Sequence, residues 1–261
     1  MSQLLDGKTV AITGATIGIG RAIAIEMAKS GANVAVNYFP DKTHEQHAET
    51  LRKEIEQIRG KSAVFVAVPG DIAEPDTGKE LVARAVEKFG ELNIFVSNAG
   101  ICPFHEFTTM PPEVYLRTVQ VNLNGAFFAT QAAAAQMKAQ GKGGSIIGIA
   151  SISALVGGEF QTHYTPTKAG VLSLMQSTAV ALGKYGIRCN ALLPGTILTD
   201  INKEDLSDLT KREKMEGRIP LGRLGNPDDL AGPAVFLASD MSKYITGAQI
   251  LVDGGLFVNL Q

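Results

Sequence analysis

The sequence predicts an α/β fold, a doubly wound parallel sheet of seven strands with helices on both faces. Short runs rich in β-branched residues alternate with longer helical patterns, as expected where crossover helices join parallel strands. These short runs are continuously apolar, which is typical of strands covered on both faces. Glycines follow most of the helical patterns, at the places where helices end. No stretch of the 261 residues has the composition of a linker or repeat, so we expect one domain over residues 1–261.

The expected elements alternate along the whole chain. The strands are Thr9–Thr13, Asn33–Asn37, Ala63–Val68, Ile94–Ser97, Ser145–Ala150, Arg188–Leu193 and Gln249–Val252. The helices are Ile19–Ser30, Thr43–Gly60, Pro75–Phe89, Pro112–Gln140, Gln161–Tyr185 and Pro227–Ser239. Residues 194–220, which follow the sixth strand, are too many for a simple connection, and such long loops often cover active sites. We call residues 194–220 the lid.

The composition argues against several classes of protein. The net charge is −2 and no basic patch is visible, so a nucleic-acid partner is not expected. The first residues lack the pattern of a signal peptide, and no apolar run reaches the ~18 residues that suggest a membrane span. Cys102 and Cys189 form no CxxC motif, and no His, Cys and carboxylate cluster has metal-ligand spacing. We therefore expect a cytoplasmic protein with no membrane partner and no metal.

A glycine-rich turn follows the first strand and leads into the first helix. It runs Gly14-Ala15-Thr16-Ile17-Gly18-Ile19-Gly20. Such a turn lets the backbone approach a pyrophosphate, and the helix N-terminus supplies N–H groups and the positive end of a dipole. A glycine triplet alone also fits an ordinary tight turn.

Four motifs in order extend this interpretation. They are TGATIGIG at residues 13–20, SNAG at 97–100, Tyr164-x3-Lys168, and Pro194-Gly195. Together they resemble the short-chain dehydrogenase/reductase family over about residues 7 to 261. The resemblance implies a Rossmann fold, NAD or NADP as cofactor, and a homotetramer built through long helices and last strands. The apolar tail Leu256–Gln261 is expected to lie against a neighbouring subunit.

The resemblance also implies which residues hold the cofactor. Besides Gly14, Ile17, Gly18, Ile19 and Gly20, they are Asn37, Asp71, Ile72, Asn98, Ala99, Gly100, Tyr164, Lys168, Pro194, Gly195, Ile197 and Thr199. The end of the second strand distinguishes NAD from NADP, through an acidic residue for the ribose or a basic one for the 2′-phosphate. Residues 37–42 show neither clearly, and Ile17 occupies a position where NADP-using relatives often carry a basic residue. The sequence therefore favours NAD weakly and leaves both open.

The expected catalytic residues are Asn122, Ser151, Tyr164 and Lys168. Tyr164 and Lys168 are four apart, which puts them on one helical face, although such pairs are often surface contacts. A tyrosine pKa near 10 is too high for an efficient base at neutral pH. An ammonium at ~4 Å with an effective dielectric of ~20 contributes about 4 kcal/mol, or roughly three pKa units. Ser151 can bond the substrate oxygen, and the resemblance implies that Asn122 holds a water that relays protons.

Three segments narrow the substrate. Residues 151–170, 199–206 and 251–261 look like those of L-rhamnose 1-dehydrogenases, which implies oxidation of the anomeric carbon of an aldose to a lactone. The expected sugar contacts are Ser151, Ser153, Gln161, Tyr164, Thr196 and Asn202. A site that pairs several hydroxyls discriminates strongly, but Ser153 and Gln161 also fit a role in bracing the helix that carries Tyr164.

Several alternatives remain open at this point. They are another sugar or polyol dehydrogenase, a broad-range ketone reductase, and a nucleotide-sensing protein without turnover. An acyl-carrier-protein reductase would need a basic patch near the pocket mouth. The lid instead mixes Lys203 and Lys211 with Glu204, Asp205 and Asp208. Cys102, Phe104 and His105 fit either a pocket border or simple packing.

Overall fold

The computed structural model describes residues 3–60, 64–202 and 205–259. Its sheet is all-parallel, with strand order β3-β2-β1-β4-β5-β6-β7, which confirms the predicted doubly wound fold. The strands are β1 Thr9–Ile12, β2 Asn33–Tyr38, β3 Phe65–Pro69, β4 Ile94–Ser97, β5 Gly144–Ile149, β6 Ile187–Pro194 and β7 Gln249–Val252. Every predicted strand is present, and the ends differ by at most one residue apart from the start of the third strand. Its predicted first residue, Ala63, lies outside the described residues.

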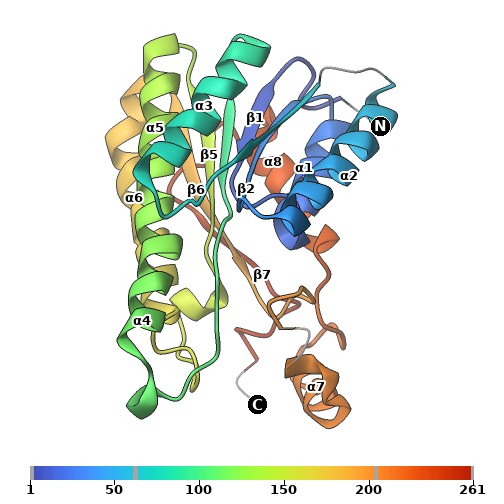
Figure 1. The fold of residues 1–261 in the computed structure, drawn as a ribbon, viewed down its shortest axis with the longest axis vertical. Helices are drawn as coiled ribbons and strands as arrows, with labels where there is room; N and C mark the ends of the chain where they lie inside the picture. The colour runs from blue at the N-terminus through green and yellow to red at the C-terminus, as the bar shows by residue number, and fades with distance from the viewer. Residues whose placement is uncertain (1–2, 61–63, 203–204, 260–261) are drawn as a thin grey trace.

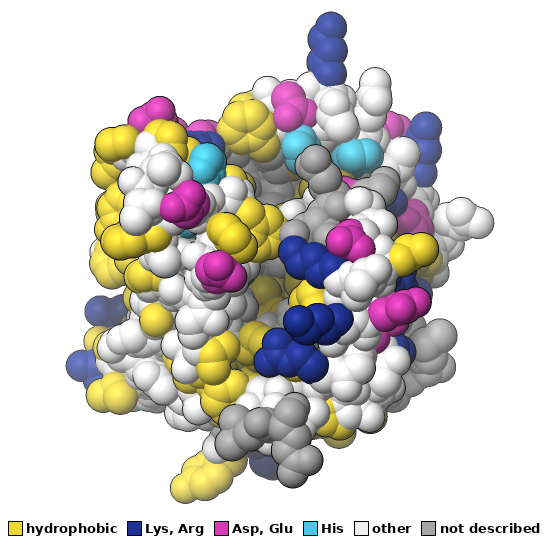
Figure 2. All heavy atoms as spheres, turned by 90° about the horizontal axis from the view of Figure 1, so that it is seen from below, with side chains coloured by type: hydrophobic (Ala, Val, Ile, Leu, Met, Phe, Trp, Pro, Cys, Tyr) yellow, Lys and Arg dark blue, Asp and Glu magenta, His cyan; other side chains and the backbone are white. Residues whose placement is uncertain are grey.

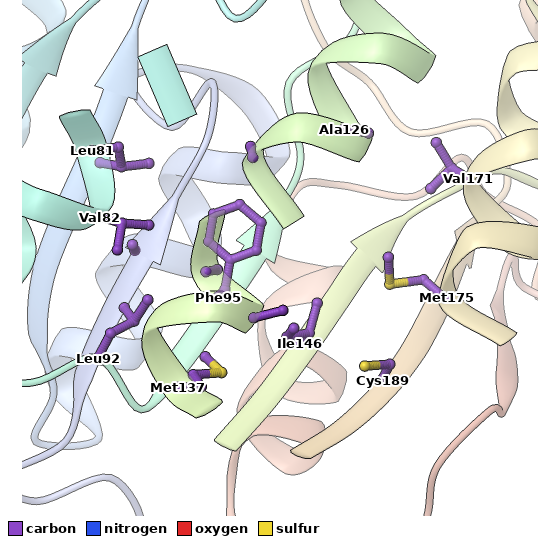
Figure 3. Close-up of a cluster of buried hydrophobic side chains, with 14 of the residues drawn as sticks. Leu81, Val82, Leu92, Phe95, Ala126, Met137, Ile146, Val171, Met175 and Cys189 are labelled. Carbon is purple, nitrogen blue, oxygen red and sulfur yellow. The ribbon is translucent and has the colours of Figure 1, made fainter. Parts of the chain in front are cut away.

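Helices cover both faces of the sheet, as Figure 1 shows. One face carries α1 (Gly18–Lys29), α2 (Lys42–Arg59) and α8 (Asp228–Ala238), and the other carries α3 (Pro75–Phe89), α5 (Ala126–Gln140) and α6 (Thr165–Leu182). Each layer encloses its own apolar core, and Figure 3 shows the one beneath α3, α5 and α6. Phe95 of β4 and Ile146 of β5 are fully buried there, and each such side chain contributes roughly 1.5–3 kcal/mol by leaving water.

The predicted helix Pro112–Gln140 is interrupted. The chain forms α4 (Pro112–Val119), a π-helical turn over Gln120–Gly125, and then α5. A Cβ on Gly125 would lie 2.6 Å from the Ile72 carbonyl oxygen, so the turn packs directly on the loop after β3. Periodicity did not predict the interruption because the π-helical turn has only six residues and lies between two α-helices. Single π-turns are rare and are often found at functional sites.

The helix predicted from Gln161 begins later, at Thr165, and ends at Leu182. Pro166 lies in its first turn, where its fixed φ and missing N–H suit a helix start. Tyr164 is therefore the residue that immediately precedes the first turn, and Gln161 belongs to the preceding turn.

The lid contains a helix that the sequence did not predict, α7 (Leu209–Gly217). Its sequence, LTKREKMEG, has no apolar stripe to reveal it, but the Asp208 carboxylate accepts from the Thr210 and Lys211 N–H groups and caps its start. Residues on either side of the helix in sequence, Leu206, Ile219 and Leu224, form a small apolar cluster with Leu256 of the tail. Leu256 is partly buried within its own chain, whereas Val258 is 71% exposed. The contact of the tail with a neighbouring subunit stays a prediction. Lys203, Glu204, Leu260 and Gln261 lie outside the described residues.

Candidate active site

A cavity of about 1110 Å³ opens at the carboxyl ends of the strands. The strand order reverses between β1 and β4, and in doubly wound sheets ligands bind at such a switch point. Figure 2 looks at this end of the molecule and shows the hollow, with apolar side chains on one side and Lys and Arg side chains on the other.

Almost all the predicted site residues line this one cavity. They are Gly14, Ile17, Gly18, Ile19, Asn37, Asp71, Ile72, Asn98, Ala99, Gly100, Ser151, Ser153, Gln161, Tyr164, Lys168, Pro194, Gly195, Thr196, Ile197, Thr199 and Asn202. Gly20 and Asn122 are both buried and do not line the cavity. The chain thus brings together side chains from loops up to about 190 residues apart in sequence.

The glycine loop fits a dinucleotide. A Cβ on Gly14 would lie 2.8 Å from Ala99 Cα, and a Cβ on Gly20 would lie 2.5 Å from Asn98 Nδ2. Asn98 holds the loop by donating to the Thr13 and Gly14 carbonyls at 2.9 and 2.8 Å. Ile17, which precedes α1, provides no side-chain cap, so the first N–H groups of that helix face the cavity as donors for an anion. A pyrophosphate needs such a cradle.

The far end of the cavity, after β2 and β3, is organised by hydrogen bonds among the predicted residues. Asp71 forms a 2.8 Å ion pair with Arg117 of α4 and accepts from the Ala73 N–H. Asn37 donates its amide to the Gly70 carbonyl at 2.9 Å, which ties β2 to the end of β3 and leaves Oδ1 as its remaining polar atom. The sequence analysis missed Arg117, because nothing local distinguishes it from other surface arginines on a helix.

Tyr164, Lys168 and Ser151 converge on the centre of the cavity. Lys168 is 5% exposed, and its ammonium donates to the Ile149 carbonyl at 2.9 Å and lies 5.6 Å from the centre of the Tyr164 ring. Ser151 follows β5, and its hydroxyl accepts from the Ser153 N–H at 3.0 Å. A base, a cation and a hydroxyl therefore face one space, as acid–base chemistry on an alcohol requires.

The pKa of Tyr164 differs from the expectation. Burial raises the pKa of Tyr164 above its usual value, and only the hydrogen bond with Ser151 acts in the opposite direction. Burial also lowers the pKa of Lys168 to about 8. The expected fall of the Tyr164 pKa toward neutrality was wrong for the protein groups alone, because it assumed ~4 Å and omitted the cost of removing both charges from water. The positive charge of an oxidised nicotinamide would act in the opposite direction and favour the phenolate.

The side chain of Asn122 forms hydrogen bonds within the protein, and the relay water at this residue stays a prediction. Its Oδ1 accepts from the Ile101 N–H at 2.8 Å, and its Nδ2 donates to the Ile101 carbonyl at 2.9 Å and to Thr167 Oγ1 at 3.2 Å. The amide therefore clamps the loop after β4 onto α6. A proton-relay water at this residue would have to use its main-chain carbonyl, which lies in the π-helical turn.

The predicted sugar contacts divide into two groups: those whose side chain is available to substrate, and those whose side chain bonds to the protein's own main chain. The Gln161 carbonyl accepts from the Tyr164 and Thr165 N–H groups at 2.9 Å, while its side chain lines the cavity and donates to Cys102 Sγ at 3.4 Å. The main chain of Gln161 therefore braces the helix start, and its side chain remains available to substrate.

Asn202 belongs to the second group. Its amide donates to the Ile197 carbonyl at 2.8 Å and accepts from the Thr199 N–H at 3.0 Å. Both ends of the amide hold the start of the lid, while Asn202 also lines the cavity. Direct contact between Asn202 and a sugar stays a prediction.

Other residues complete the cavity without a local sequence signal. The apolar ones are Ile101, Cys102, Phe104, Ile152, Val156, Phe160, Met215, Leu256 and Phe257, and the charged ones include Glu159, Asp200, Lys211 and Arg218. Cys102 and Phe104 thus belong to the pocket border, an alternative that the sequence left open.

Neither a metal-binding cluster nor a membrane-spanning helix is found in the described part of the chain. No group of three or more His, Cys, Asp or Glu residues there could hold a metal ion. No helix among those residues is long and apolar enough to cross a membrane.

Comparisons with known proteins agree with this geometry. A family model described as enoyl-(acyl carrier protein) reductase matches residues 14–257. The chain is 67% identical to L-rhamnose-1-dehydrogenase from Scheffersomyces stipitis, with 100% of both chains covered. It is 64% identical to L-rhamnose 1-dehydrogenase (NAD(P)(+)) from Azotobacter vinelandii, covering 99% of this chain and 100% of the relative.

A solved structure shows the same fold. The crystal structure of a short-chain type dehydrogenase/reductase from Mycobacterium marinum is 35% identical, with a TM-score of 0.86 and coverage of 98% of this chain and 99% of that one. With the family model and full-length relatives well above 30% identity, the chain belongs to the short-chain dehydrogenase/reductase family.

Proposed function

We propose that this protein is an NAD(P)-dependent aldose dehydrogenase that oxidises L-rhamnose at its anomeric carbon to the lactone. The observation that carries the proposal is the full-length identity of 67% and 64% to two relatives named L-rhamnose 1-dehydrogenase. The cavity supports it, because Ser151, Tyr164 and Lys168 face the same space as polar side chains suited to hydroxyl groups. The name of the second relative includes both cofactors, and the preference for NAD stays a prediction.

The residues divide the chemistry as follows. Tyr164 accepts the proton of the C1 hydroxyl, and Ser151 donates a hydrogen bond to the same oxygen as the carbonyl forms. Lys168 stabilises the phenolate electrostatically, and its bond to Ile149 fixes its position. A bound oxidised nicotinamide would accept the hydride that leaves C1, which completes the two-electron oxidation.

A panel of aldoses with NAD and NADP tests the proposal. Cofactor reduction is followed by absorbance at about 340 nm. We expect L-rhamnose to give the highest kcat/KM. Higher kcat/KM for another aldose or a polyol would replace L-rhamnose as the substrate. Cofactor binding with no reduction across the panel would favour a nucleotide sensor.

A second candidate, reduction of a ketone on an acyl-carrier protein, has one observation in its favour. The lid places Lys211 and Arg218 at the cavity, where an acidic carrier would need basic groups. The matching family model is also named for a reductase of acyl-carrier-protein substrates, although for the enoyl group and not for a ketone. NADPH consumption with an acetoacetyl thioester would support this candidate, and consumption with simple ketones would indicate a broad-range reductase.

We also propose a homotetramer formed by one domain per subunit, each with its lid over residues 194–220. Large apolar side chains are exposed near α4 and α5, among them Phe107 at 71%, Leu116 at 55% and Phe127 at 45%, and Tyr244 is 99% exposed before β7. Apolar patches of this kind often mark interfaces. Light scattering tests the assembly, and a monomer would contradict it. A cytoplasmic location stays a prediction.

A further inference from the structure

The side chain of Gln161 is held in the cavity by a residue that no catalytic role explains. Its Nε2 donates to Cys102 Sγ at 3.4 Å, within the range for a bond to sulfur. We propose that Cys102 is a positioning residue that fixes the Gln161 amide for sugar recognition. This inference rests on the proposed aldose dehydrogenase activity and goes beyond it by assigning a role to Cys102.

Cys102 is suited to this task by its place in the fold. It lies on the loop after β4, lines the cavity and is 7% exposed. It pairs with no other cysteine. Burial raises the pKa of its thiol, so the group stays neutral at physiological pH and offers Gln161 an acceptor without adding a charge beside Tyr164 and Lys168.

Gly158 confines the same amide from the opposite end. A Cβ on Gly158 would lie 2.4 Å from Gln161 Oε1, so the carboxamide occupies the space that any other residue would fill. The Gln161 N–H also donates to the Gly158 carbonyl at 3.0 Å. The amide is thus placed between two loops, with one Nε2 hydrogen used by sulfur and its remaining donor and acceptor positions left for a ligand.

The loop that carries Cys102 is itself anchored to the catalytic helix. Asn122 bonds both the N–H and the carbonyl of Ile101, and it also bonds Thr167 of α6. A continuous set of hydrogen bonds therefore runs from α6 through Asn122 to the loop, and the thiol extends it to Gln161. The position of the amide relative to Tyr164 is set from both sides of the cavity.

This arrangement predicts a defect in sugar binding without a defect in chemistry. A glutamine side chain that is not held must be ordered when the sugar binds, and that cost raises the sugar KM. It does not alter the proton transfer to Tyr164. Loss of one net hydrogen bond corresponds to about a tenfold change in affinity at most.

A double-mutant cycle measures the effect, on whichever sugar the wild type oxidises best. Cys102→Ala should raise the sugar KM about fivefold to tenfold, with kcat and cofactor KM within about twofold. Cys102→Ser, which keeps an acceptor, should restore the sugar KM. Gln161→Met removes the amide at similar size, and in that background Cys102→Ala should change nothing further. Cys189→Ala, the loss of the other buried thiol, serves as the matched control.

Two results would overturn the inference. In the first, Cys102→Ala and Gln161→Met change the sugar KM independently, so that their effects multiply in the double variant. The other is a loss of cofactor affinity or thermal stability in Cys102→Ala that Cys189→Ala reproduces. Gly158→Ala supplies a second approach, since its Cβ must displace the amide and should raise the sugar KM selectively. If the best sugar is not L-rhamnose, the proposed substrate fails while the cycle still decides the role of Cys102.

Discussion

The buried charge of Lys168 should lower the stability of the folded protein. Lys168→Met, which removes the charge, should therefore raise the free energy of unfolding. The ammonium is buried, and its pKa falls from the usual 10.5 to about 8. A difference of one in pKa corresponds to about 1.4 kcal/mol, so the buried charge costs about 3 kcal/mol at neutral pH. Methionine fills a similar space without that cost.

The substitution also removes one favourable contact. The bond from Lys168 Nζ to the Ile149 carbonyl, 2.9 Å long, is lost, and the unpaired carbonyl costs about 1 kcal/mol. The net expectation for Lys168→Met at pH 7 is a gain of about 2 kcal/mol, or roughly 4–8 °C in Tm for a chain of this size. Turnover should be lost in the same variant.

The stability difference between Lys168→Met and wild type should depend on pH. Between pH 8 and 10.5 the unfolded chain keeps the Lys168 proton and the folded chain releases it, so wild-type stability rises with pH relative to the variant. The advantage of Lys168→Met should therefore shrink above pH 8 by about 1.4 kcal/mol per pH unit and reverse at about pH 9.5. Urea unfolding followed by circular dichroism at pH 7, 8, 9 and 10 measures it.

Lys53→Met is the matched control, since the Lys53 side chain is 69% exposed and its pair with Glu49 is a surface contact. Its stability difference from wild type should stay within about 0.5 kcal/mol at each pH. A Lys168→Met protein that is less stable than wild type at pH 7, or a difference that does not change with pH, would refute the reasoning.

Three further predictions address the base, the glycine loop and a buried histidine. Tyr164→Phe should lower kcat about a thousandfold while leaving the cofactor Kd, measured by calorimetry, within about twofold; near-normal turnover would contradict its role as base. Gly20→Ala should raise the cofactor KM about tenfold, because its Cβ would lie 2.5 Å from Asn98 Nδ2, and an unchanged KM would show that the loop can yield. Burial lowers the pKa of His163, so the unfolded chain takes up a proton that the folded chain refuses. Wild-type stability should therefore fall relative to His163→Gln as the pH drops below about 6.5, and parallel pH profiles of Tm would exclude this.

The sequence predicted the sheet and most of the site because both depend on local patterns. Each strand is a short apolar run, and site residues such as Asn98 and Ser151 follow strand ends, so the topology alone brings them together. The π-helical turn and α7 were missed because neither has a distinctive periodicity.

Roles that depend on tertiary contacts were harder to predict. The sequence indicated that Asn122 belongs to the site, but only the fold shows that its amide clamps Ile101. The same holds for Asn202, whose amide is occupied by Ile197 and Thr199. Side-chain amides bond whatever the fold brings near them, and a single sequence gives no information about those partners.

The pKa values of Tyr164 and Lys168 have a common cause. Both groups lie where burial penalises charge, so the protein alone favours a neutral phenol and a weakened ammonium. The Ile149 carbonyl accepts from Lys168 Nζ at 2.9 Å and fixes the position of the ammonium. Added positive charge in the cavity is therefore the factor that most favours the phenolate. An oxidised nicotinamide carries that charge and a reduced one does not, so the base should be strongest in the complex that is competent to accept a hydride.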